Sequence, residues 1–266
     1  MKAKWIFQLA CIAALVVATL GFSQPVQAGA KDPPDHPGPY IAGFTFKLLY
    51  DDAERPSPSD TDGARPVPCY VWYPAAPGDV TKMPTALYPF DPLEYYGGLP
   101  PDKSTSYEKY GMDPAYQEVP PSKAGPFPLL VFSTGLGGAA EGVYLFGARP
   151  ASYGFVVGVI PNYGAGALGE PTLSRDDWPY YLWTRVDREL DIKFGITEFI
   201  KMNADETSLL YGMINPDQIA VSGHSWGGYA ALGVVVPSGD PWFCDAEYEG
   251  YPCFIVESDP RIKATL

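Results

Sequence analysis

The pattern of hydrophobic and polar positions changes near residue 126. Downstream of that point, unbroken apolar runs of strand length alternate with longer stretches that carry apolar residues at helical spacing. The expected strands span 128–135, 155–162 and 217–223, and the expected helices span 184–203 and 227–236. Strands that are apolar on both faces and separated by helices indicate a mostly parallel sheet with helices on each side. We therefore expect an α/β fold.

Upstream of residue 126 the chain is divided by prolines, and twenty of the thirty fall between Pro33 and Pro128. Such frequent proline predicts much irregular backbone. We expect a proline-rich leader at 29–64 and a folded domain at 65–266, whose first strand lies at 67–75. Within this domain, residues 78–125 form a tyrosine- and proline-rich insertion. Loops of such length are usually functional or disordered, so this one either covers a binding cleft or is an ordinary surface excursion.

The first 28 residues have the features of a signal peptide. Lys2 and Lys4 precede an apolar run at 5–22, and the small-x-small pattern that ends at Ala28 fits signal-peptidase cleavage. The alternative is an uncleaved membrane anchor, because the run approaches the length needed to span a bilayer. We expect cleavage after Ala28, no stable membrane anchor, and export to the periplasm or the extracellular space.

The charge balance narrows the range of partners. Cleavage removes two lysines and no acids, so the formal net charge changes from −13 to −13 − 2 = −15. An acidic excess of this size argues against nucleic acid or anionic lipid as the main partner. Solubility is its simplest consequence.

The four cysteines agree with export. Cys11 leaves with the signal peptide, and Cys244 and Cys253 bracket a short loop that a disulfide could close in an oxidising compartment. Cys69 lies in a strand-like run, where a buried thiol is expected. The cysteine spacing matches no zinc-site pattern, and the sequence has only two histidines. We therefore expect no metal or organic cofactor.

The sequence GHSWG at 223–227 carries the clearest chemistry. It follows an expected strand and precedes an expected helix, which is the setting of a nucleophile elbow. In such an elbow the turn is so tight that the serine adopts a strained backbone conformation, and a side chain at Gly223 or Gly227 would collide with neighbouring elements. Ser225 is therefore the candidate nucleophile, placed at the N-terminus of a helix that favours negative charge.

A second glycine-rich turn, TGLGG at 134–138, follows the expected strand 128–135. Read alone, this turn only ends a strand. Beside a nucleophile elbow, it is where the second backbone donor for an oxyanion is expected. We assign the two donors of this oxyanion hole to the backbone N–H groups of Leu136 and Trp226.

The segments FPLLVFSTGLGG, LFGARPASYGFVVGVIPN and GHSWGGYAALG together resemble the α/β-hydrolase superfamily, and most of all its platelet-activating-factor acetylhydrolase and dienelactone-hydrolase-like branch. The resemblance covers residues 65–266 apart from the insertion, with 65–75 similar to the N-terminal strand of that branch and 258–266 similar to the approach to the strand after the elbow. One departure is visible, because Thr134 stands where relatives usually carry histidine. The resemblance implies an α/β-hydrolase fold and a serine nucleophile.

In this fold the triad acid and histidine follow the serine, and no histidine follows Ser225. We expect the ring of His224 to point into the packing around the turn, and His36 to lie in the leader. Glu257 and Asp259 precede the next strand and are expected at the surface. The ending RIKATL reads as the opening of a buried strand. We therefore expect this chain to be a fragment whose triad acid and histidine lie outside it, so that these 266 residues alone are inactive.

The expected function of the intact protein is that of an exported serine esterase, acetylhydrolase- or lipase-like, acting on a small-molecule or lipid-like ester. Aromatic loops at 88–116 and 178–183 are expected to flank its pocket. Two alternatives stay open. A prolyl-oligopeptidase-like peptidase also fits G-x-S-x-G-G-Y, and a non-catalytic binding protein could keep the elbow as a relic.

Overall fold

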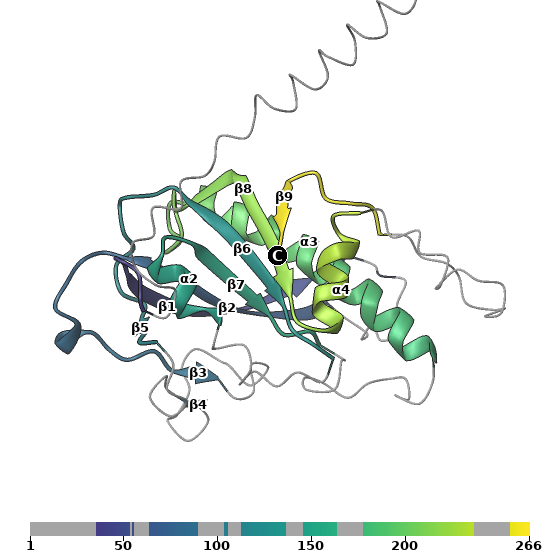
Figure 1. The fold of residues 1–266 in the computed structure, drawn as a ribbon, viewed down its shortest axis with the longest axis horizontal. Coiled ribbons are helices and arrows are strands. Elements are labelled where there is room, and N and C mark those ends of the chain that lie inside the picture. Colours follow the sequence, from purple (N-terminus) through teal and green to yellow (C-terminus); the bar gives the residue numbers. More distant parts are fainter. Residues whose placement is uncertain are drawn as a thin grey trace, which may run out of the picture. The chain divides into compact units, whose positions relative to one another are not determined.

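A computed structural model describes residues 36–53, 55, 64–89, 104–105, 113–136, 146–163, 178–236 and 256–266, with only the secondary structure for 104–105 and 178–182. All of these residues except His36 belong to a compact unit that runs from Pro37 to Leu266 (Figure 1). In this described part of the chain, no helix is both long and apolar enough to cross a membrane.

A seven-stranded sheet forms the centre of this unit, with strand order β5-β1-β2-β7-β6-β8-β9. Its strands are β1 (Ile41–Asp51), β2 (Arg65–Ala75), β5 (Tyr116–Gln117), β6 (Phe127–Ser133), β7 (Val156–Ile160), β8 (Ile214–Gly223) and β9 (Ile262–Thr265). The helices are α2 (Ala148–Ser152), α3 (Trp178–Ala204) and α4 (Trp226–Gly233), with a short 3-10 turn η1 (Val80–Lys82). Strands β3 (Tyr88–Pro89) and β4 (Ser104–Thr105) pair separately.

The sheet is mixed, but one half of it is parallel. Strands β7, β6, β8 and β9 run parallel to one another, while β2 runs antiparallel to both β1 and β7. The α/β architecture predicted from the apolar runs is confirmed, because helices separate these parallel strands in the sequence and lie on both faces of the sheet.

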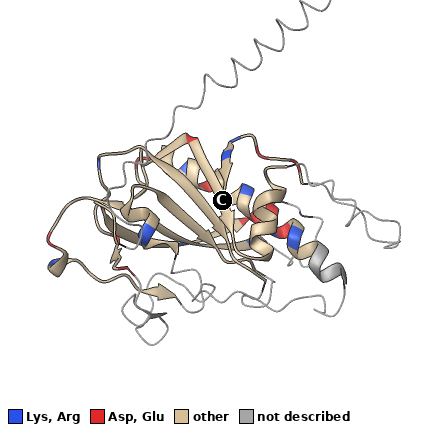
Figure 2. Ribbon diagram, in the orientation of Figure 1, with Lys and Arg blue, Asp and Glu red and all other residues tan. Residues whose placement is uncertain are grey.

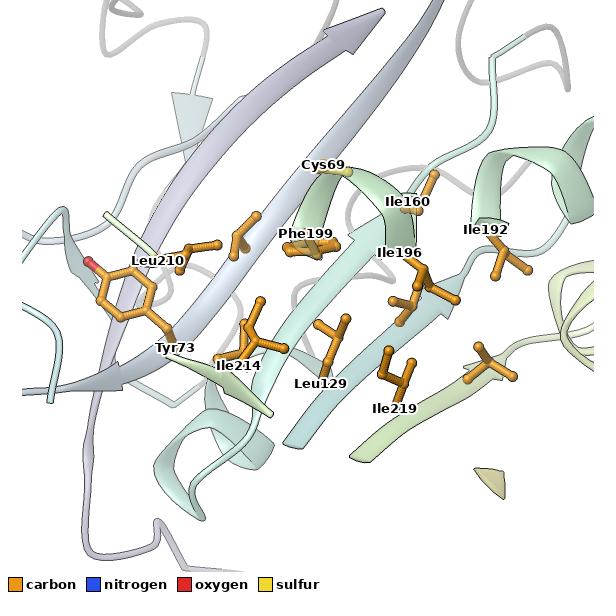
Figure 3. Close-up of a cluster of buried hydrophobic side chains, with 14 of the residues drawn as sticks. Cys69, Tyr73, Leu129, Ile160, Ile192, Ile196, Phe199, Leu210, Ile214 and Ile219 are labelled. Carbon is orange, nitrogen blue, oxygen red and sulfur yellow. The ribbon is translucent and has the colours of Figure 1, made fainter. Parts of the chain in front are cut away.

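Alternate positions along each strand supply the two faces of the sheet. On β2, Tyr70 and Trp72 pack in the same buried cluster as the α2 residue Ala151. Cys69 and Val71, which occupy the alternate positions of β2, belong to the larger cluster that includes α3 and α4. Figure 3 shows this larger cluster, in which side chains of β6, β7 and β8 meet the apolar side of α3. The burial predicted for Cys69 is confirmed.

Close packing of α3 on β7 depends on a glycine in each element. A methyl group at Gly158 of β7 would lie 2.3 Å from the Phe199 ring of α3. In the reverse direction, a methyl group at Gly195 of α3 would lie 2.5 Å from Ile160 of β7. Each element therefore receives a large side chain of the other above its own glycine, which brings the two backbones close together.

Strand β1 differs from the sequence interpretation. Residues 41–51 fall in the expected leader, yet they form an eleven-residue strand that pairs along its length with β2, from Ile41↔Ala75 to Asp51↔Arg65. The strand lies between proline-rich stretches and contains Gly43, Thr45 and Lys47, so its sequence shows no unbroken apolar run. Its pairing with β2 shields both strands from solvent. Because the pairing partners lie farther along the chain, no local sequence pattern predicts this strand.

Three further expectations are corrected. Residues 178–183, expected as an aromatic loop, are the first turns of α3. Strand β9 forms at the predicted place beside β8, but it is partly to fully exposed instead of buried. Asp259, expected at the surface, is 5% exposed and accepts hydrogen bonds from the Arg261 guanidinium. Glu257 is exposed as expected.

The described part of the insertion packs on the sheet. Tyr88 is 1% exposed and joins the aromatic cluster of Phe44 and Trp72, with the Trp72 indole donating to its hydroxyl at 3.3 Å. Strand β5 pairs with β1, and Pro121 bridges to Ala75. The insertion therefore contributes core contacts through Tyr88 and an edge of the sheet through residues 116–121.

Candidate functional site

The candidate site lies where the parallel strands β6 and β8 end. From β6 the chain passes to β7 on one side, and from β7 it crosses to β8 on the other side of β6. The crevice outside the carboxyl ends of two such strands is the point at which open α/β sheets bind ligands. Ser133 and Gly223, the last residues of β6 and β8, are register partners. The glycine-rich turn and Ser225 follow them directly, so both motifs found in the sequence meet at this point.

Ser225 has the strained conformation expected of an elbow nucleophile. Its φ is 53° and its ψ is −120°, and it is one of two non-glycine residues with positive φ in the described part of the chain. Such a conformation costs about 1–3 kcal/mol and persists only where the surroundings impose it. Ser225 is exposed and immediately precedes α4, so its side chain is accessible at a helix N-terminus.

The flanking glycines are required by contact. A methyl group at Gly223 would lie 2.3 Å from the Gly227 carbonyl carbon, and one at Gly227 would lie 2.2 Å from the Ser133 carbonyl oxygen. These neighbours are backbone atoms, which cannot rotate away. The steric reason predicted for both glycines is therefore confirmed.

The turn after β6 lies against the elbow. A methyl group at Gly135 would be 3.4 Å from Cβ of Ser225 and 3.0 Å from Nδ1 of His224. The His224 N–H donates to the Ser133 carbonyl at 3.2 Å, which continues the strand pairing into the turn. The structure thus brings together Ser225, the turn that holds Leu136, and Trp226 at the start of α4. Gly137 and Gly138 lie outside the described residues.

The exposure of His224 differs from expectation. The residue is exposed instead of packed around the turn, and its Nδ1 is close to Gly135. The reason is that the turn beside it carries glycine, which leaves room for an imidazole at the surface. His224 therefore borders the site. Because it is the immediate neighbour of Ser225 in the tight turn, we do not assign it as the base for Ser225.

Aromatic pairs lie next to Ser225 and next to the glycine-rich turn in the sequence. The rings of Trp226 and Tyr229 stack with centroids 5.2 Å apart, and the Trp226 indole donates to the Thr184 hydroxyl at 3.2 Å. At the end of β6, the rings of Phe132 and Phe146 stack with centroids 4.9 Å apart, and Phe146 is half exposed. The aromatic residues of the insertion between 90 and 112 lie outside the described residues.

A buried polar network, which no sequence motif predicted, lies beneath the glycine-rich turn. Arg188 of α3 is 1% exposed, and its guanidinium donates to the Thr134 carbonyl at 2.6 Å and to the Gly135 carbonyl at 3.3 Å. It also donates to the side-chain oxygen of Asn162, which accepts a second hydrogen bond from the Ser133 hydroxyl at 3.1 Å.

The network continues away from the turn into an ion-pair cluster. The Asn162 amide donates to Asp191 at 2.9 Å, and Asp191 accepts from Arg65 at 2.9 Å and Arg55 at 2.7 Å. Burial alone would raise the pKa of Asp191, but the two guanidiniums outweigh burial and hold its pKa well below the usual range. Asp191 is therefore a buried carboxylate that stays ionised.

The sequence carries no local signal for this network. When each residue of α3 is rotated by 100°, the charged residues between 185 and 191 share one arc of about 200°, and Val186 and Leu190 occupy the remainder. This is the pattern of an amphipathic helix with a solvated polar face, so the burial of these charges follows from the tertiary structure. Figure 2 shows acidic and basic residues together along α3. Among the described residues, no group of three or more His, Cys, Asp or Glu side chains could hold a metal ion. Cys244 and Cys253 lie outside these residues.

The sheet and the elbow together define an α/β-hydrolase type of fold, with a mostly parallel sheet, helices on both faces and a strained serine between β8 and α4. Among solved structures, the chain is similar to a ferulic acid esterase from Streptomyces cinnamoneus, with 20% identity and a TM-score of 0.45, over 73% of this chain and 54% of that chain. The chain thus spans about half the length of that enzyme. No family model and no curated protein matches the sequence.

Proposed function

We propose that the protein is a serine hydrolase that cleaves carboxylic esters, with Ser225 as its nucleophile. One observation carries this proposal: an exposed serine with a φ of 53° lies at the ends of β6 and β8, between two glycines that admit no side chain. This conformation reduces stability, so a role in chemistry accounts for its presence better than packing does.

The proposed reaction follows the acyl-enzyme course. The Ser225 oxygen forms a bond to the ester carbonyl carbon while a base accepts its proton. The N–H groups of Leu136 and Trp226 donate to the resulting oxyanion. The bond to the alcohol oxygen then breaks, the base returns its proton to the leaving alcohol, and water hydrolyses the acyl-enzyme by the same steps. No metal or organic cofactor takes part in these steps.

The base and its acid are proposed to come from outside residues 1–266. His224 is adjacent to the nucleophile and exposed. Gly38, which follows His36 closely in the chain, donates its N–H to the Ser152 hydroxyl at the end of α2, shortly before β7 begins. That end of the sheet is opposite Ser225. Asp259 is held by Arg261, so it is not assigned as the triad acid.

The substrate proposed is a small-molecule or lipid-like ester, as in the platelet-activating-factor acetylhydrolase and dienelactone-hydrolase-like branch that the sequence resembles. Apolar aromatic surface near Ser225, including the Trp226–Tyr229 pair, favours an apolar acyl or alcohol group. The formal net charge of −13 makes nucleic acid an unfavourable partner.

The test compares the full-length protein with its Ser225→Ala variant. We expect hydrolysis of p-nitrophenyl acetate, labelling by a fluorophosphonate at Ser225, and loss of both in the variant. Removal of an activated serine should reduce kcat by at least about 10⁴-fold. Ser222→Ala is the matched control, because the Ser222 hydroxyl donates to the Leu266 carbonyl and points to β9.

The same assay separates the alternatives. A prolyl-oligopeptidase-like enzyme would cleave aminoacyl-proline amides faster than short acyl esters. A binding protein would bind ester ligands without turnover and would leave Ser225 unlabelled. Either result, obtained with folded full-length protein, would overturn the ester-hydrolase proposal.

We also propose that the protein is exported after cleavage behind Ala28. N-terminal sequencing of the protein isolated from its source is expected to begin at Gly29. A mature chain that begins at Met1 would overturn this proposal, and mass analysis of unreduced peptides would test the Cys244–Cys253 disulfide.

A further inference from the structure

The buried guanidinium of Arg188 has no part in the proposed reaction, yet it lies directly under the turn that holds an oxyanion donor. Its charge is costly to bury, and an apolar residue of similar volume could fill the same space. The contacts explain why arginine is present. One guanidinium donates to two successive backbone carbonyls, those of Thr134 and Gly135, and also to Asn162.

We propose that Arg188 is a positioning residue that orients the Leu136 N–H toward the oxyanion. The carbonyl of Gly135 and the N–H of Leu136 belong to the same peptide group, and in a trans peptide these two bonds point in opposite directions. A hydrogen bond that holds the Gly135 carbonyl down onto Arg188 therefore aims the Leu136 N–H away from α3. This inference rests on the proposed function of Leu136 and Ser225.

The second carbonyl contact limits how the turn can rotate. With the Thr134 oxygen held at 2.6 Å and the Gly135 oxygen at 3.3 Å, two adjacent peptide planes are fixed at once. Glycine at 135 has no side chain to restrict its dihedral angles, so the turn depends on such external contacts for its conformation. The positive charge also polarises both peptides, which strengthens hydrogen bonds donated by their N–H groups.

Arg188 is itself fixed from below. Asn162 accepts from Arg188 and from the Ser133 hydroxyl with one oxygen, and donates to Asp191 with its nitrogen. Lysine could not reproduce this arrangement, because a single ammonium lacks the planar fork that reaches two carbonyls and an amide in fixed directions.

The experiment measures Arg188→Lys in the full-length protein, with Arg185→Lys as the matched control. Arg185 is also 1% exposed, lies one turn earlier on α3, and pairs with Glu189 at 3.7 Å. The readouts are kcat and KM for p-nitrophenyl acetate, and the inhibition constant of phenylboronic acid, which forms a tetrahedral adduct on an active serine. Thermal unfolding reports on the fold.

For Arg188→Lys we expect kcat to fall about 10²-fold with KM within about threefold, and boronate inhibition to weaken by a similar factor as kcat, which matches loss of one oxyanion donor. Arg185→Lys should lower thermal stability while keeping kcat and boronate inhibition. Equal kcat values for Arg188→Lys and wild type would overturn the positioning role while the ester-hydrolase proposal stands. Absence of turnover and labelling in folded wild type would instead overturn the proposed function, and the inference with it.

A milder variant covers failure of Arg188→Lys to fold. Ser133→Ala removes the hydroxyl that donates to Asn162 and leaves the charges in place. It is expected to lower kcat and boronate affinity together by about three- to tenfold at unchanged KM, in line with one weakened hydrogen bond. A folded Ser133→Ala protein with wild-type kcat and boronate affinity would overturn the inference.

Discussion

Gly227 shows how strictly backbone contacts define the elbow. Its Cα faces the carbonyl oxygens of Ser133 and Thr134, at 2.2 Å and 2.4 Å from where a methyl group would lie. The Ser133 oxygen belongs to the end of β6, and the Thr134 oxygen belongs to the glycine-rich turn. A side chain here would push α4 away from β6 and separate Ser225 from that turn.

Gly227→Ala is therefore expected to lower the free energy of unfolding by about 1–3 kcal/mol, the usual cost of overpacking, and to abolish labelling of Ser225. Urea unfolding and fluorophosphonate labelling provide the measurement. Gly228→Ala is the control, because its methyl group would approach its nearest neighbour, the Gly223 carbonyl oxygen, only to 3.0 Å. A Gly227→Ala protein as stable as Gly228→Ala would contradict this explanation.

The pair of α3 and β7 shows the same dependence between whole elements. Phe199 lies over Gly158, in the centre of the cluster that Figure 3 shows. Because the ring and the glycine are complementary, their effects on stability should not add.

Gly158→Ala is expected to lower the free energy of unfolding by about 1–3 kcal/mol. In the double variant Gly158→Ala/Phe199→Leu, the smaller side chain makes room for the methyl group. The double variant should be more stable than the sum of the single variants predicts, by about 0.5–3 kcal/mol. Urea unfolding of all four proteins gives this coupling. Strict additivity would mean that α3 does not pack on β7 through this pair.

The elements of the parallel half were predictable because each is a local pattern. The apolar runs gave β6, β7 and β8 within a few residues, and the periodic apolar positions gave α3 and α4. Strand β1 was not predictable in this way, because its polar positions are covered by contacts with residues distant in the sequence. The elbow was predictable because its serine and the two flanking glycines that it requires lie within one short stretch of the sequence. The Arg188 network was not predictable, because the charges of α3 between 185 and 191 share one side of the helix, as they do on a solvated polar face.

At the level of the whole molecule, the ion-pair cluster connects one end of the β1–β2 pair, where Asp51 faces Arg65, to α3. Arg55 follows β1, Arg65 begins β2, and both donate to Asp191 in the middle of α3. Asp191 is 1% exposed, so removal of its charge leaves two guanidiniums buried with less compensation.

Asp191→Asn is expected to lower the free energy of unfolding by about 3–5 kcal/mol near pH 7. The pKa of Asp191 is lower in the folded state than in the unfolded chain. Its contribution is therefore fully present above the unfolded pKa of about 4, and is lost as the pH falls from there toward the folded pKa.

The stability gap between wild type and Asp191→Asn should accordingly shrink below about pH 4, as measured by urea unfolding from pH 3 to pH 7. Asp217→Asn makes the same chemical change at an exposed carboxylate of β8 and should change stability by less than about 0.5 kcal/mol. A gap that stays constant across this pH range would show that Asp191 does not contribute through its charge.

The pairing of β6 with β8 has a consequence for the order in which the molecule is assembled. The register partners Ser133 and Gly223 are 223 − 133 = 90 positions apart, and β7 and α3 lie between them in the chain. Contacts of such separation carry a large loop-closure entropy and form slowly. Until β8 inserts beside β6, the serine has no glycine-rich turn against it and nothing imposes its strained backbone. Nascent and partly folded chains therefore lack the strained Ser225 conformation, which forms only with the tertiary structure.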